Sequence, residues 1–473
     1  MSNKHDIAII GAGPGGYIAA LHAAQKGADT AVVESRFLGG TCLNVGCIPS
    51  KALLAPAGLL HAIRNGGALG VSVAGEPQFD WPSIQKHLTR TVRTLRGGVG
   101  MLFKSRGVTL YEGRARLAGP GKVRVETDDG TEELAAGKVI IATGSVPVRI
   151  PGWPDDPELL CTSEEALFWD APPKRLLIVG GGVIGCEFAC MMNAFGVDVT
   201  VVEMLPRLMP VLEDQLGDTM GEIFAARGIT CLTDTKVDEM TTGDGAIAAK
   251  LSDGRTIEAD KCLVAVGRKP NTDDLGLDAV GIETERGAIA VNDRMETSAE
   301  GVYCIGDANG RWQLAHAASA QGIVAAENAT GGDRIDDKPV PTAEYTFPEI
   351  ASVGLTTKEA RKRGLAVSVG TFPLRNLGKA KAVAHDEGFC KVIRDRGDGR
   401  LLGVHVLGHN ATEIIHAAAA LMGKHASAED LAEMTIAHPT ISEGLKEAAE
   451  DSFSRALHSP PRQTVTVTVG DED

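Results

Sequence analysis

The sequence lacks the features that mark several classes of protein. No run approaches the ~20 consecutive apolar residues of a transmembrane helix, so we expect no membrane span. Basic residues form no cluster, and 47 Lys and Arg residues are outnumbered by 62 Asp and Glu residues. Nucleic acid is therefore not expected as a partner. The N-terminal apolar segment is broken by Asp6 and by glycines and a proline between 11 and 16, unlike a secretory signal, and we expect a cytoplasmic protein.

Cysteines are also few, and their arrangement is irregular. Nine are spread over the chain, at positions 42, 47, 161, 186, 190, 231, 262, 304 and 390. An odd, scattered set does not form the disulfide framework of a small secreted protein. A structural zinc site needs four ligands, and the chain offers no second half-site to complete one. We therefore expect no metal and interpret most of these thiols, including Cys186 and Cys190, as core residues.

Length and composition indicate a globular protein of several domains. A single hydrophobic core stops growing at about 250–300 residues, whereas this chain has 473. Hydrophobic residues make up 43% of the sequence and charged residues 23%, as in ordinary globular proteins. Internal patterns must therefore show where the domains divide.

A near-repeat organises the first half of the chain. The segment DIAIIGAGPGGYIAALHAAQKGADTAVVE at 6–34 recurs 169 positions later as RLLIVGGGVIGCEFACMMNAFGVDVTVVE at 175–203. Each copy has an apolar strand pattern, a GxGxxG motif, a helical pattern, a second strand pattern and a final glutamate. The motif residues are Gly11, Gly13, Gly16 and Glu34 in the first copy, and Gly180, Gly182, Gly185 and Glu203 in the second.

This strand–turn–helix pattern is typical of dinucleotide-binding units. The glycines permit a tight turn and a close approach of backbone to pyrophosphate, and the helix N-terminus supplies N–H donors to the anion. The final glutamate is placed to accept hydrogen bonds from ribose hydroxyls. Glu203 would repel a 2′-phosphate, and the following segment offers only Arg207 as a cation, so NAD is favoured over NADP. Two such units in one chain imply electron transfer between two redox cofactors.

The predicted fold is α/β. KVIIATGSVPVRIPG at 138–152 is echoed by KCLVAVGRKPNT at 261–272, which indicates that the second unit is inserted in the first. We expect two Rossmann-like dinucleotide-binding domains followed by an α+β domain. The expected boundaries are 1–149 for the first unit, 150–270 for the second, 271–344 for the return to the first, 345–462 for the α+β domain, and 463–473 for a tail that is an edge strand or disordered.

Cys42 and Cys47 lie five positions apart in GGTCLNVGCIPSK at 39–51, just beyond the first of the two glutamates. They could be metal ligands, inert buried thiols or a redox pair. In a regular helix, residues i and i+5 are ~7.5 Å apart along the axis, so their Cα atoms exceed the ~7 Å limit for a disulfide. Gly46 permits the distorted turn that a bridge would need. Because strained disulfides are the reducible ones, this pattern favours a redox pair.

The segment GGTCLNVGCIPSKALL resembles the active-site segment of the flavoprotein disulfide reductases, the class I pyridine nucleotide-disulfide oxidoreductases of glutathione-reductase-like fold. The blocks ATGSVP, GGGVIGCEF, VGRKPNT, GDANGRWQLAHAASAQG, FPEIASVG and HPTISEGLKEA follow in the family's order. The resemblance covers nearly the whole chain. It is greatest to members that oxidise a protein-bound dihydrolipoyl group with reduction of NAD+.

The resemblance implies two cofactors and assigns residues to each. FAD would occupy the first unit and NAD the second, with cysteines and nicotinamide on opposite faces of the flavin. Besides the first glycine motif and Glu34, the residues implied for FAD are Lys51, Gly113, Thr143, Gly144, Ser145, Asp307, Gln313, Leu314, Ala315 and His316. Besides the second motif and Glu203, those implied for NAD are Val237 and Gly267, and Glu187 is implied as the partner of Lys51 beside the flavin.

The resemblance also implies catalytic roles and partners. Cys47 would lie nearer the flavin as a thiolate, and Cys42 would exchange with the substrate dithiol. His438 would accept the proton, and Glu443 would orient its ring. In this family the histidine comes from the other subunit, which implies a homodimer joined through the last domain. The expected protein partners carry lipoyl groups, in 2-oxo acid dehydrogenase or glycine cleavage complexes.

Other functions within the family fit less well. Mercuric reductase and the large thioredoxin reductases use cysteines near the C-terminus, whereas the last one here is Cys390. Glutathione reductase would need arginines in place of Glu203, and soluble transhydrogenase lacks one of the two active-site cysteines. A flavoprotein that serves mainly as an assembly subunit is the non-catalytic alternative. The intact set of Cys42, Cys47, His438 and Glu443 argues against it.

Overall fold

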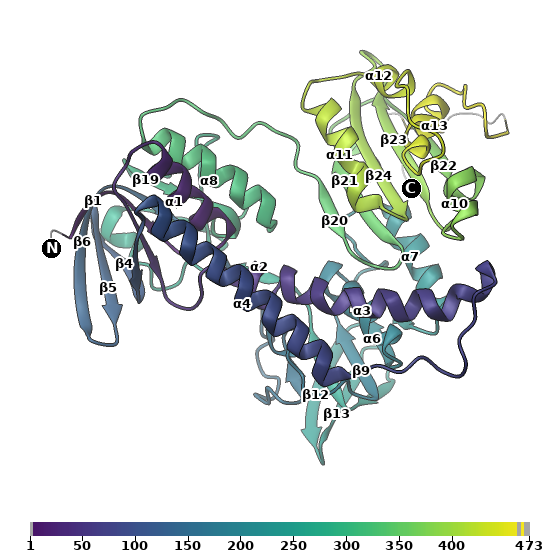
Figure 1. Ribbon diagram of the computed structural model, residues 1–473, viewed down its shortest axis with the longest axis horizontal. Coiled ribbons are helices and arrows are strands. Elements are labelled where there is room, and N and C mark those ends of the chain that lie inside the picture. The colour runs from purple at the N-terminus through teal and green to yellow at the C-terminus, as the bar shows by residue number, and fades with distance from the viewer. Residues whose placement is uncertain (1–2, 461–464, 468–473) are drawn as a thin grey trace.

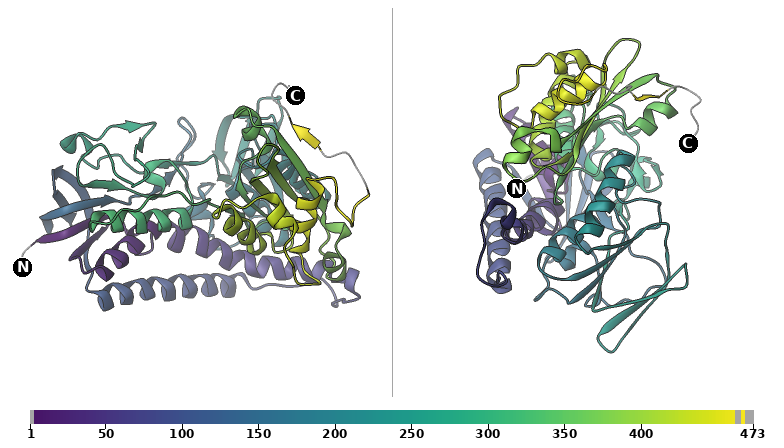
Figure 2. Two further views of the ribbon diagram at one scale, coloured as in Figure 1. Left: turned by 90° about the horizontal axis from the view of Figure 1, so that it is seen from above. Right: turned by 90° about the vertical axis from the view of Figure 1, so that its right-hand side faces the viewer.

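The computed structural model shows two α/β units and one α+β unit, and it describes residues 3–460 and 465–467 (Figure 1). The first unit contains the N-terminal strand, the second contains β9, β12 and β13, and the third carries the C-terminal helices. Two long helices, α3 (Cys47–Asn65) and α4 (Trp81–Arg106), run along one side of the molecule (Figure 2). The arrangement confirms the predicted fold class.

The first unit is built on a sheet of seven strands in the order β3-β2-β1-β6-β5-β4, with β19 beside β6. Strands β1, β2, β3, β6 and β19 run parallel, while β4 and β5 are antiparallel to their neighbours. Strand β19 pairs with β6 of this sheet, although the whole second unit lies between these two strands in the sequence. The predicted insertion is therefore confirmed. The strands are β1 (Lys4–Ile10), β2 (Thr30–Glu34), β3 (Thr109–Glu112), β4 (Arg114–Gly119), β5 (Lys122–Thr127), β6 (Gly130–Ile141) and β19 (Val302–Cys304).

Helices α1 (Pro14–Gln25) and α8 (Ala315–Ala329) pack closely against each other in the first unit. Small residues allow this approach, since a Cβ added to Gly322 of α8 would lie 2.5 Å from the Gly15 carbonyl oxygen of α1. Alanines fill the rest of the contact and are buried. The first unit thus holds two helices together by backbone proximity rather than by large side chains.

The second unit repeats this plan with a parallel sheet in the order β11-β10-β9-β15-β8. Its strands are β8 (Leu160–Cys161), β9 (Arg175–Val179), β10 (Asp198–Val202), β11 (Thr230–Leu232) and β15 (Lys261–Val264). An antiparallel sheet of β12 (Val237–Gly243), β13 (Ala246–Leu251) and β14 (Thr256–Ala259) completes it, with helices α5 (Ser163–Ala166), α6 (Val183–Ala194) and α7 (Asp214–Ala226). The chain enters through β7 (Ser145–Pro147) and leaves through β16 (Arg268–Pro270), and these two segments pair antiparallel.

The third unit is an antiparallel sheet in the order β20-β21-β24-β23-β22-β25. It begins at Thr342, three residues before the expected boundary. For the tail the sequence predicts either an edge strand or disorder. Residues Val465–Val467 pair with β22 as an edge strand, and 461–464 and 468–473 lie outside the described residues. The elements are β20 (Thr342–Glu344), β21 (Glu349–Gly354), β22 (Val367–Pro373), β23 (Phe389–Asp395), β24 (Leu401–Gly408), β25 (Val465–Val467), α9 (Thr357–Lys362), α10 (Gly378–Ala382), α11 (Ala411–Met422), α12 (Ala428–Ala432) and α13 (Glu443–Asp451).

One helical stretch among the described residues, Gly40–Leu69, is long and apolar enough by length and composition to cross a membrane, although no unbroken apolar run of that length occurs in it. It comprises α2 (Gly40–Val45), α3 and the 3-10 turn Gly66–Leu69, and it carries Lys51 and Arg64. Half of its most apolar window is buried inside the protein, where α3 packs on α4 and α6. Burial of this kind is what a core helix requires.

A buried ion pair joins the second unit to the third. Glu213, just before α7, lies 2.5 Å from the Lys391 Nζ of β23, and both side chains are almost wholly buried. The Thr357 N–H and hydroxyl donate to the same carboxylate. Burial works to raise the pKa of Glu213, but the Lys391 charge and these hydrogen bonds outweigh it and lower the pKa.

We predict that Lys391→Met destabilises the protein by about 3–5 kcal/mol, because it leaves the Glu213 carboxylate buried without its cation. Thermal unfolding should show the loss, and the double variant with Glu213→Gln should recover part of it. Lys269→Met, which breaks an exposed pair with Asp273, is the control and should change stability by about 1 kcal/mol or less. Equal effects of Lys391→Met and Lys269→Met would contradict the prediction.

Since the pKa of Glu213 is lowered on folding, the contribution of its charge to the free energy of unfolding should be present above the unfolded pKa of about 4.3. This contribution should be lost as pH falls through the pKa of the folded protein.

Candidate active site at the cysteine pair and the two glycine turns

The first glycine turn connects β1 to α1, and two of its glycines are sterically required. Gly11 has a φ of +101°, and a Cβ on it would overlap the Ala142 carbonyl oxygen. A Cβ on Gly16 would overlap the Gly11 carbonyl oxygen. Gly13 lies at the N-cap of α1, which Pro14 begins, so the free N–H groups of the first helical turn face the loop.

The second turn, between β9 and α6, has the same construction. Gly180 has a φ of +107° with no room for a Cβ beside the Ala265 carbonyl, and a Cβ on Gly185 would overlap the Gly180 carbonyl oxygen. Gly182 is the N-cap of α6 and has open space around it. The equivalent glycines of the two turns are thus required for the same steric reasons. Each turn also offers a helix N-terminus to an anion.

The two glutamates that end the motifs also hold the glycine turns, a role that sequence reasoning did not assign. Glu34 accepts hydrogen bonds from the Ala12 N–H and the Arg36 N–H, each at 2.7 Å. Glu203 is buried and accepts from the Gly181 N–H at 2.6 Å and the Leu205 N–H at 2.8 Å. The same carboxylates that are expected to meet ribose therefore bind the backbone of the phosphate-binding loops.

The other residues assigned to FAD surround the first turn. The Gly113 N–H donates to the Glu34 carbonyl oxygen at 2.9 Å. The Ser145 hydroxyl donates to Asp307 at 2.5 Å, and burial raises the pKa of Asp307. Thr143 and Gly144 precede β7, and the Thr143 hydroxyl is buried without a hydrogen-bond partner among the described residues.

The segment 313–316 leads into helix α8. The Gln313 side chain donates to the Arg268 carbonyl oxygen at 3.1 Å, and His316 Nε2 lies 2.7 Å from the Pro341 carbonyl oxygen. Leu314 is the N-cap of α8 and Ala315 its first residue. Because α8 packs on α1, a second helix N-terminus is brought to the first unit.

These features fit a dinucleotide in each unit. Two glycines of each turn leave no space for a side chain, the N-cap glycine has open space beside it, and each turn presents backbone N–H groups. The Thr143 hydroxyl, which lacks a hydrogen-bond partner among the described residues, offers a polar atom to a ligand. In the second unit Gly267 has a φ of +118° just before β16. Val237, in contrast, is buried at the start of β12 in the antiparallel sheet.

Cys42 and Cys47 are brought together by a break between two helices. Cys42 lies in α2 and is half-buried, whereas Cys47 is the first residue of α3 and is exposed. Gly46 between them has a φ of −145° and a ψ of −113°, so the helix does not continue through it. Both thiols are free, and each acts on the pKa of the other.

The pKa values of the two thiols move in opposite directions. The hydrogen bond from Cys42 and the charge of Lys51 lower the pKa of Cys47. The hydrogen bond to Cys47, together with burial, raises the pKa of Cys42. Cys47 also stands at a helix N-terminus, a position that favours thiolate. Cys47 is therefore the more readily ionised thiol of the pair, and Cys42 is the one that holds its proton more tightly.

Lys51 connects this pair to the second unit. Its Nζ lies 2.9 Å from both carboxylate oxygens of Glu187, which is on α6. The Tyr345 ring lies against Lys51 Nζ at 4.4 Å, and the Tyr345 N–H donates to Glu187 at 3.0 Å. Sequence reasoning paired Lys51 with Glu187 but missed Tyr345, whose contribution is a ring and a backbone N–H rather than a charge.

His438 and Glu443 form a second pair, on the third unit. His438 Nδ1 lies 2.8 Å from Glu443 Oε1, and the Thr440 N–H donates to Glu443 Oε2 at 2.8 Å. Burial works to raise the pKa of Glu443, but these hydrogen bonds outweigh it and lower the pKa. The Glu443 carboxylate therefore accepts the hydrogen bond, and the Nδ1 of the ring carries the proton. The Nε2 of the neutral ring is then a free base, and the His438 side chain is 77% exposed.

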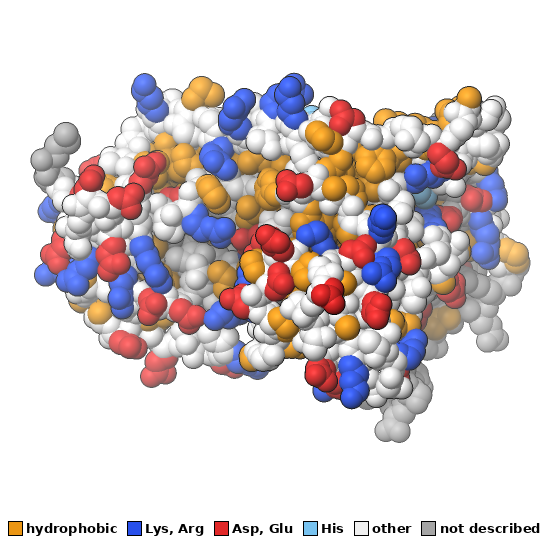
Figure 3. All heavy atoms as spheres, turned by 90° about the horizontal axis from the view of Figure 1, so that it is seen from below, with side chains coloured by type: hydrophobic (Ala, Val, Ile, Leu, Met, Phe, Trp, Pro, Cys, Tyr) orange, Lys and Arg blue, Asp and Glu red, His pale blue; other side chains and the backbone are white. Residues whose placement is uncertain are grey.

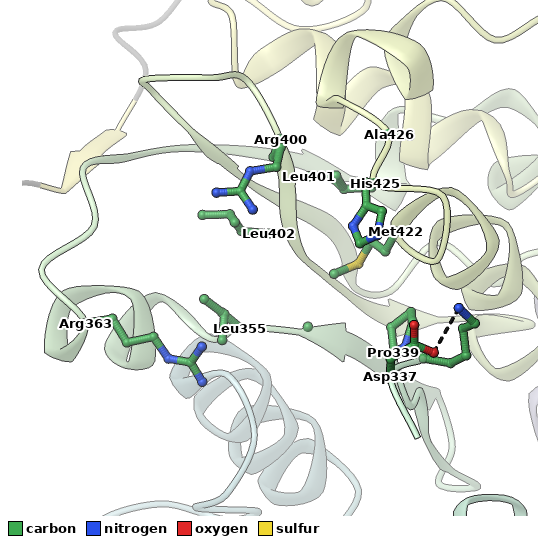
Figure 4. A pocket seen from close by; sticks show the side chains of 12 residues that line it. Asp337, Pro339, Leu355, Arg363, Arg400, Leu401, Leu402, Met422, His425 and Ala426 are labelled. Atoms are coloured by element: carbon green, nitrogen blue, oxygen red, sulfur yellow. Dashed lines mark ion pairs between the residues drawn. The ribbon is translucent and has the colours of Figure 1, made fainter. Parts of the chain in front are cut away.

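Within one chain His438 is not part of the cysteine site. It is on the surface of the third unit, beside α13, whereas the cysteines lie on α2 and α3 at the centre of the molecule (Figure 1). The third unit also has a cavity of about 350 Å³ that Arg363 and Arg400 line on one side and Met422 and His425 on the other (Figure 4). None of the residues selected from the sequence lines that cavity.

Comparisons with known proteins cover almost the whole chain. Residues 5–322 match the family described as "Pyridine nucleotide-disulphide oxidoreductase", and residues 340–449 match its dimerisation domain. A dihydrolipoyl dehydrogenase of Bacillus subtilis is 40% identical over 97% of this chain and all of that protein, and one of Thermus scotoductus is 41% identical over 96% and 98%.

Solved structures show the same architecture. LpdA of Mycobacterium tuberculosis has a TM-score of 0.87 at 29% identity and covers 95% of this chain and 99% of its own. The HOCl-induced flavoprotein disulfide reductase RclA of Escherichia coli has a TM-score of 0.83 at 26% identity, covering 94% of this chain and 99% of its own.

We predict that Gly16→Ala removes the bound flavin, because the added methyl group would collide with the Gly11 carbonyl oxygen and open the first turn. The purified variant should lose its yellow absorbance while keeping its helical circular dichroism. Gly97→Ala in α4, where a Cβ meets open space, is the matched control and should retain the flavin. Full flavin content in Gly16→Ala would show that this turn does not hold the cofactor.

Proposed function

Because the chain belongs to the pyridine nucleotide-disulphide oxidoreductase family, we propose that it acts as a dihydrolipoyl dehydrogenase. It oxidises protein-bound dihydrolipoamide to lipoamide and reduces NAD+ to NADH, with FAD and NAD as cofactors. The observation that carries this proposal is the Cys42–Cys47 pair, whose pKa values are driven apart beside Lys51. Relatives named dihydrolipoyl dehydrogenase that match over nearly their full length support it.

The cysteine pair performs thiol–disulfide exchange. In the oxidised enzyme, a thiolate of the substrate attacks Cys42 Sγ and breaks the Cys42–Cys47 bond, which leaves Cys47 as a thiolate. The second substrate thiol then displaces Cys42, so the substrate disulfide forms and Cys42 takes a proton. The raised pKa of Cys42 suits a thiol that must accept this proton, and the lowered pKa of Cys47 suits a leaving thiolate.

His438 and Glu443 act as the proton acceptor of this exchange and the group that orients it. Each substrate thiol must lose its proton before it can attack, and the free Nε2 of His438 can accept it. The Glu443 carboxylate holds the ring through Nδ1 and stabilises the imidazolium that forms. The His438 side chain is exposed within one chain, whereas Glu443 is half-buried beside it.

FAD would be held by the first turn, Glu34 and the 143–145 segment, and NAD by the second turn and Glu203. FAD at this place would supply an acceptor for the electron pair of the dithiol and allow its transfer to NAD+ as hydride. Lys51 keeps a positive charge beside Cys47, which favours the thiolate on which this transfer depends. The overall reaction forms one disulfide, reduces one NAD+ to NADH and releases one proton. The buried Glu203 carboxylate favours NAD+ over its 2′-phosphorylated form.

The protein is a homodimer, and we propose that His438 acts across the subunit boundary. The third unit matches a dimerisation domain. Helices α3 and α4 expose Leu59, Leu95 and Met101, and apolar side chains gather in a band on the face shown in Figure 3. Exposed apolar surface of this kind is typical of an interface. The further partners we propose are lipoyl-bearing proteins, whose lipoyl groups supply the substrate dithiol.

We predict that Cys47→Ser abolishes NAD+ reduction by dihydrolipoamide, because no disulfide can form with Cys42. Steady-state NADH formation, normalised to flavin content, measures this. Cys390→Ser, which changes a buried thiol of the third unit, should retain most of the activity. Substantial turnover by Cys47→Ser would rule out the exchange mechanism.

Mixed dimers test whether His438 acts on the partner's cysteines. Cys47→Ser and His438→Gln homodimers should both be inactive. A hybrid of the two contains one site with intact cysteines and an intact histidine if the residues act in trans, so it should recover about half of the parent activity. A hybrid as inactive as both homodimers would place the histidine and the cysteines of one site in the same chain.

A further inference from the structure

A buried carboxyl group on β20 has no role in the mechanism described above. Glu344 is only 2% exposed, and its Oε2 has no hydrogen-bond partner among the described residues. It is the last residue of its strand and pairs with Ile350 of β21. A buried carboxylate oxygen without a donor is costly, because it loses its hydration without replacement.

The groups that act on Glu344 are those of the cysteine site. Glu187 on α6 works to raise its pKa and Lys51 on α3 to lower it, so both members of that ion pair lie within electrostatic reach. The next residue, Tyr345, covers Lys51 with its ring and donates its N–H to Glu187. Glu344 is therefore the sequence neighbour of the residue that contacts both members of the Lys51–Glu187 pair, the only ion pair between the cysteine helix and α6 in the described part of the chain.

Other titratable groups approach from the neighbouring elements. Cys190 on α6 accepts a hydrogen bond from the Phe347 N–H, and Cys47, Glu349 and Glu413 act on Tyr345. Glu349 is held by the Thr412 N–H and hydroxyl, and Cys190 is a buried thiol with a raised pKa. Lys51 is thus the one cation acting on the Glu344 carboxyl, against the carboxylate of Glu187.

Burial is the largest influence on Glu344, and Glu187 adds to it. Together they raise the pKa of Glu344 to about 8, while the Thr342 hydroxyl and Lys51 offset only part of the rise. At neutral pH the cluster then holds one ammonium, one carboxylate and one neutral carboxyl group. Loss of the proton would add a second negative charge and change the net charge of the cluster from zero to −1.

We propose that Glu344 is a positioning residue that keeps the Lys51 charge available to the reduced site by staying protonated beside the Lys51–Glu187 pair. The proposal rests on the redox function proposed above and concerns the same site. Two-electron reduction of the disulfide places one proton on Cys42 and leaves a negative charge on the Cys47 thiolate. A neutral Glu344 lets Lys51 compensate that charge, whereas an ionised Glu344 competes for Lys51 and opposes the reduction.

Thermodynamic linkage fixes the direction in which pH should change the ease of reduction. As pH rises through the pKa of Glu344, the parent protein should become harder to reduce than a variant that stays neutral at this position. Glu344→Gln supplies such a variant with nearly the same shape. Parent and variant should therefore agree below this pH and diverge above it. A purely structural defect would separate them equally at every pH.

The test is an equilibrium redox titration of the flavin-loaded dimer with dithionite and a reference dye, at about pH 6.5 and about pH 9.5, on either side of that pKa. We expect parent and Glu344→Gln to have equal reduction equilibria at the lower pH. At the higher pH, Glu344→Gln should favour the reduced state at least about threefold more than the parent. Curves that coincide at both pH values, or differ equally at both, would overturn the proposal.

Two further variants complete the design. Glu344→Asp restores a carboxyl group and should follow the parent. Asp336→Asn removes another carboxyl whose pKa is raised by burial, beside Gln321 and away from Lys51, and should also follow the parent. Divergence of Asp336→Asn by the same factor would contradict the specific role of Glu344.

An infrared measurement on the unmodified dimer keeps the proposal testable if Glu344→Gln does not fold. A protonated carboxyl stretch should be present at neutral pH and disappear with a midpoint near the pKa of about 8. Absence of such a band would overturn the proposal. Because neither experiment uses dihydrolipoamide, failure here is distinguishable from failure of the proposed substrate.

Discussion

The interaction between the Cys42 and Cys47 thiols, each of which acts on the pKa of the other, is the one on which the rest of the site depends. It exists because Gly46 ends one helix and allows another to begin at the next residue. A continuous helix would separate the two thiols by more than a disulfide can span. The same break gives Cys47 a helix N-terminus and places Lys51 one turn further along α3. One interruption therefore creates the pair and the charge asymmetry between its members.

The surrounding architecture brings two dinucleotide-binding turns to this pair. The second unit is inserted in the first, and the chain crosses between them through β7 and β16, which pair with each other. Lys51 and Glu187 add a direct bond between α3 of the first unit and α6 of the second. The Glu213–Lys391 pair then ties the second unit to the third. Electron transfer between cofactors requires that the units holding them stay at a fixed distance from each other. The strand pairing and the two ion pairs fix the relative positions of the units at three separate places.

Much of the fold and site could be predicted from the sequence because the requirements are local. Gly11, Gly16 and their counterparts are needed for steric reasons that a spacing pattern records, and the insertion follows from the order of the repeats. Contacts between distant segments could not be predicted this way. Glu344 occupies an ordinary strand pattern, and only its packing shows that the Oε2 of its carboxyl group is buried without a hydrogen-bond partner among the described residues. The backbone bonds of Glu34 and Glu203, and the start of the third sheet at Thr342, likewise depend on tertiary structure.

The most direct test of the account is an anaerobic titration of the purified protein with dihydrolipoamide, followed in the visible spectrum, and then addition of NAD+. The account predicts a long-wavelength absorbance from the Cys47 thiolate beside the flavin, complete after one equivalent of dithiol, and stoichiometric NADH when NAD+ is added. A flavin that dihydrolipoamide leaves unchanged, while NADH produces the same absorbance, would keep the redox pair but contradict the proposed substrate. A flavin that neither reductant changes in this way would contradict the central role of the cysteine pair.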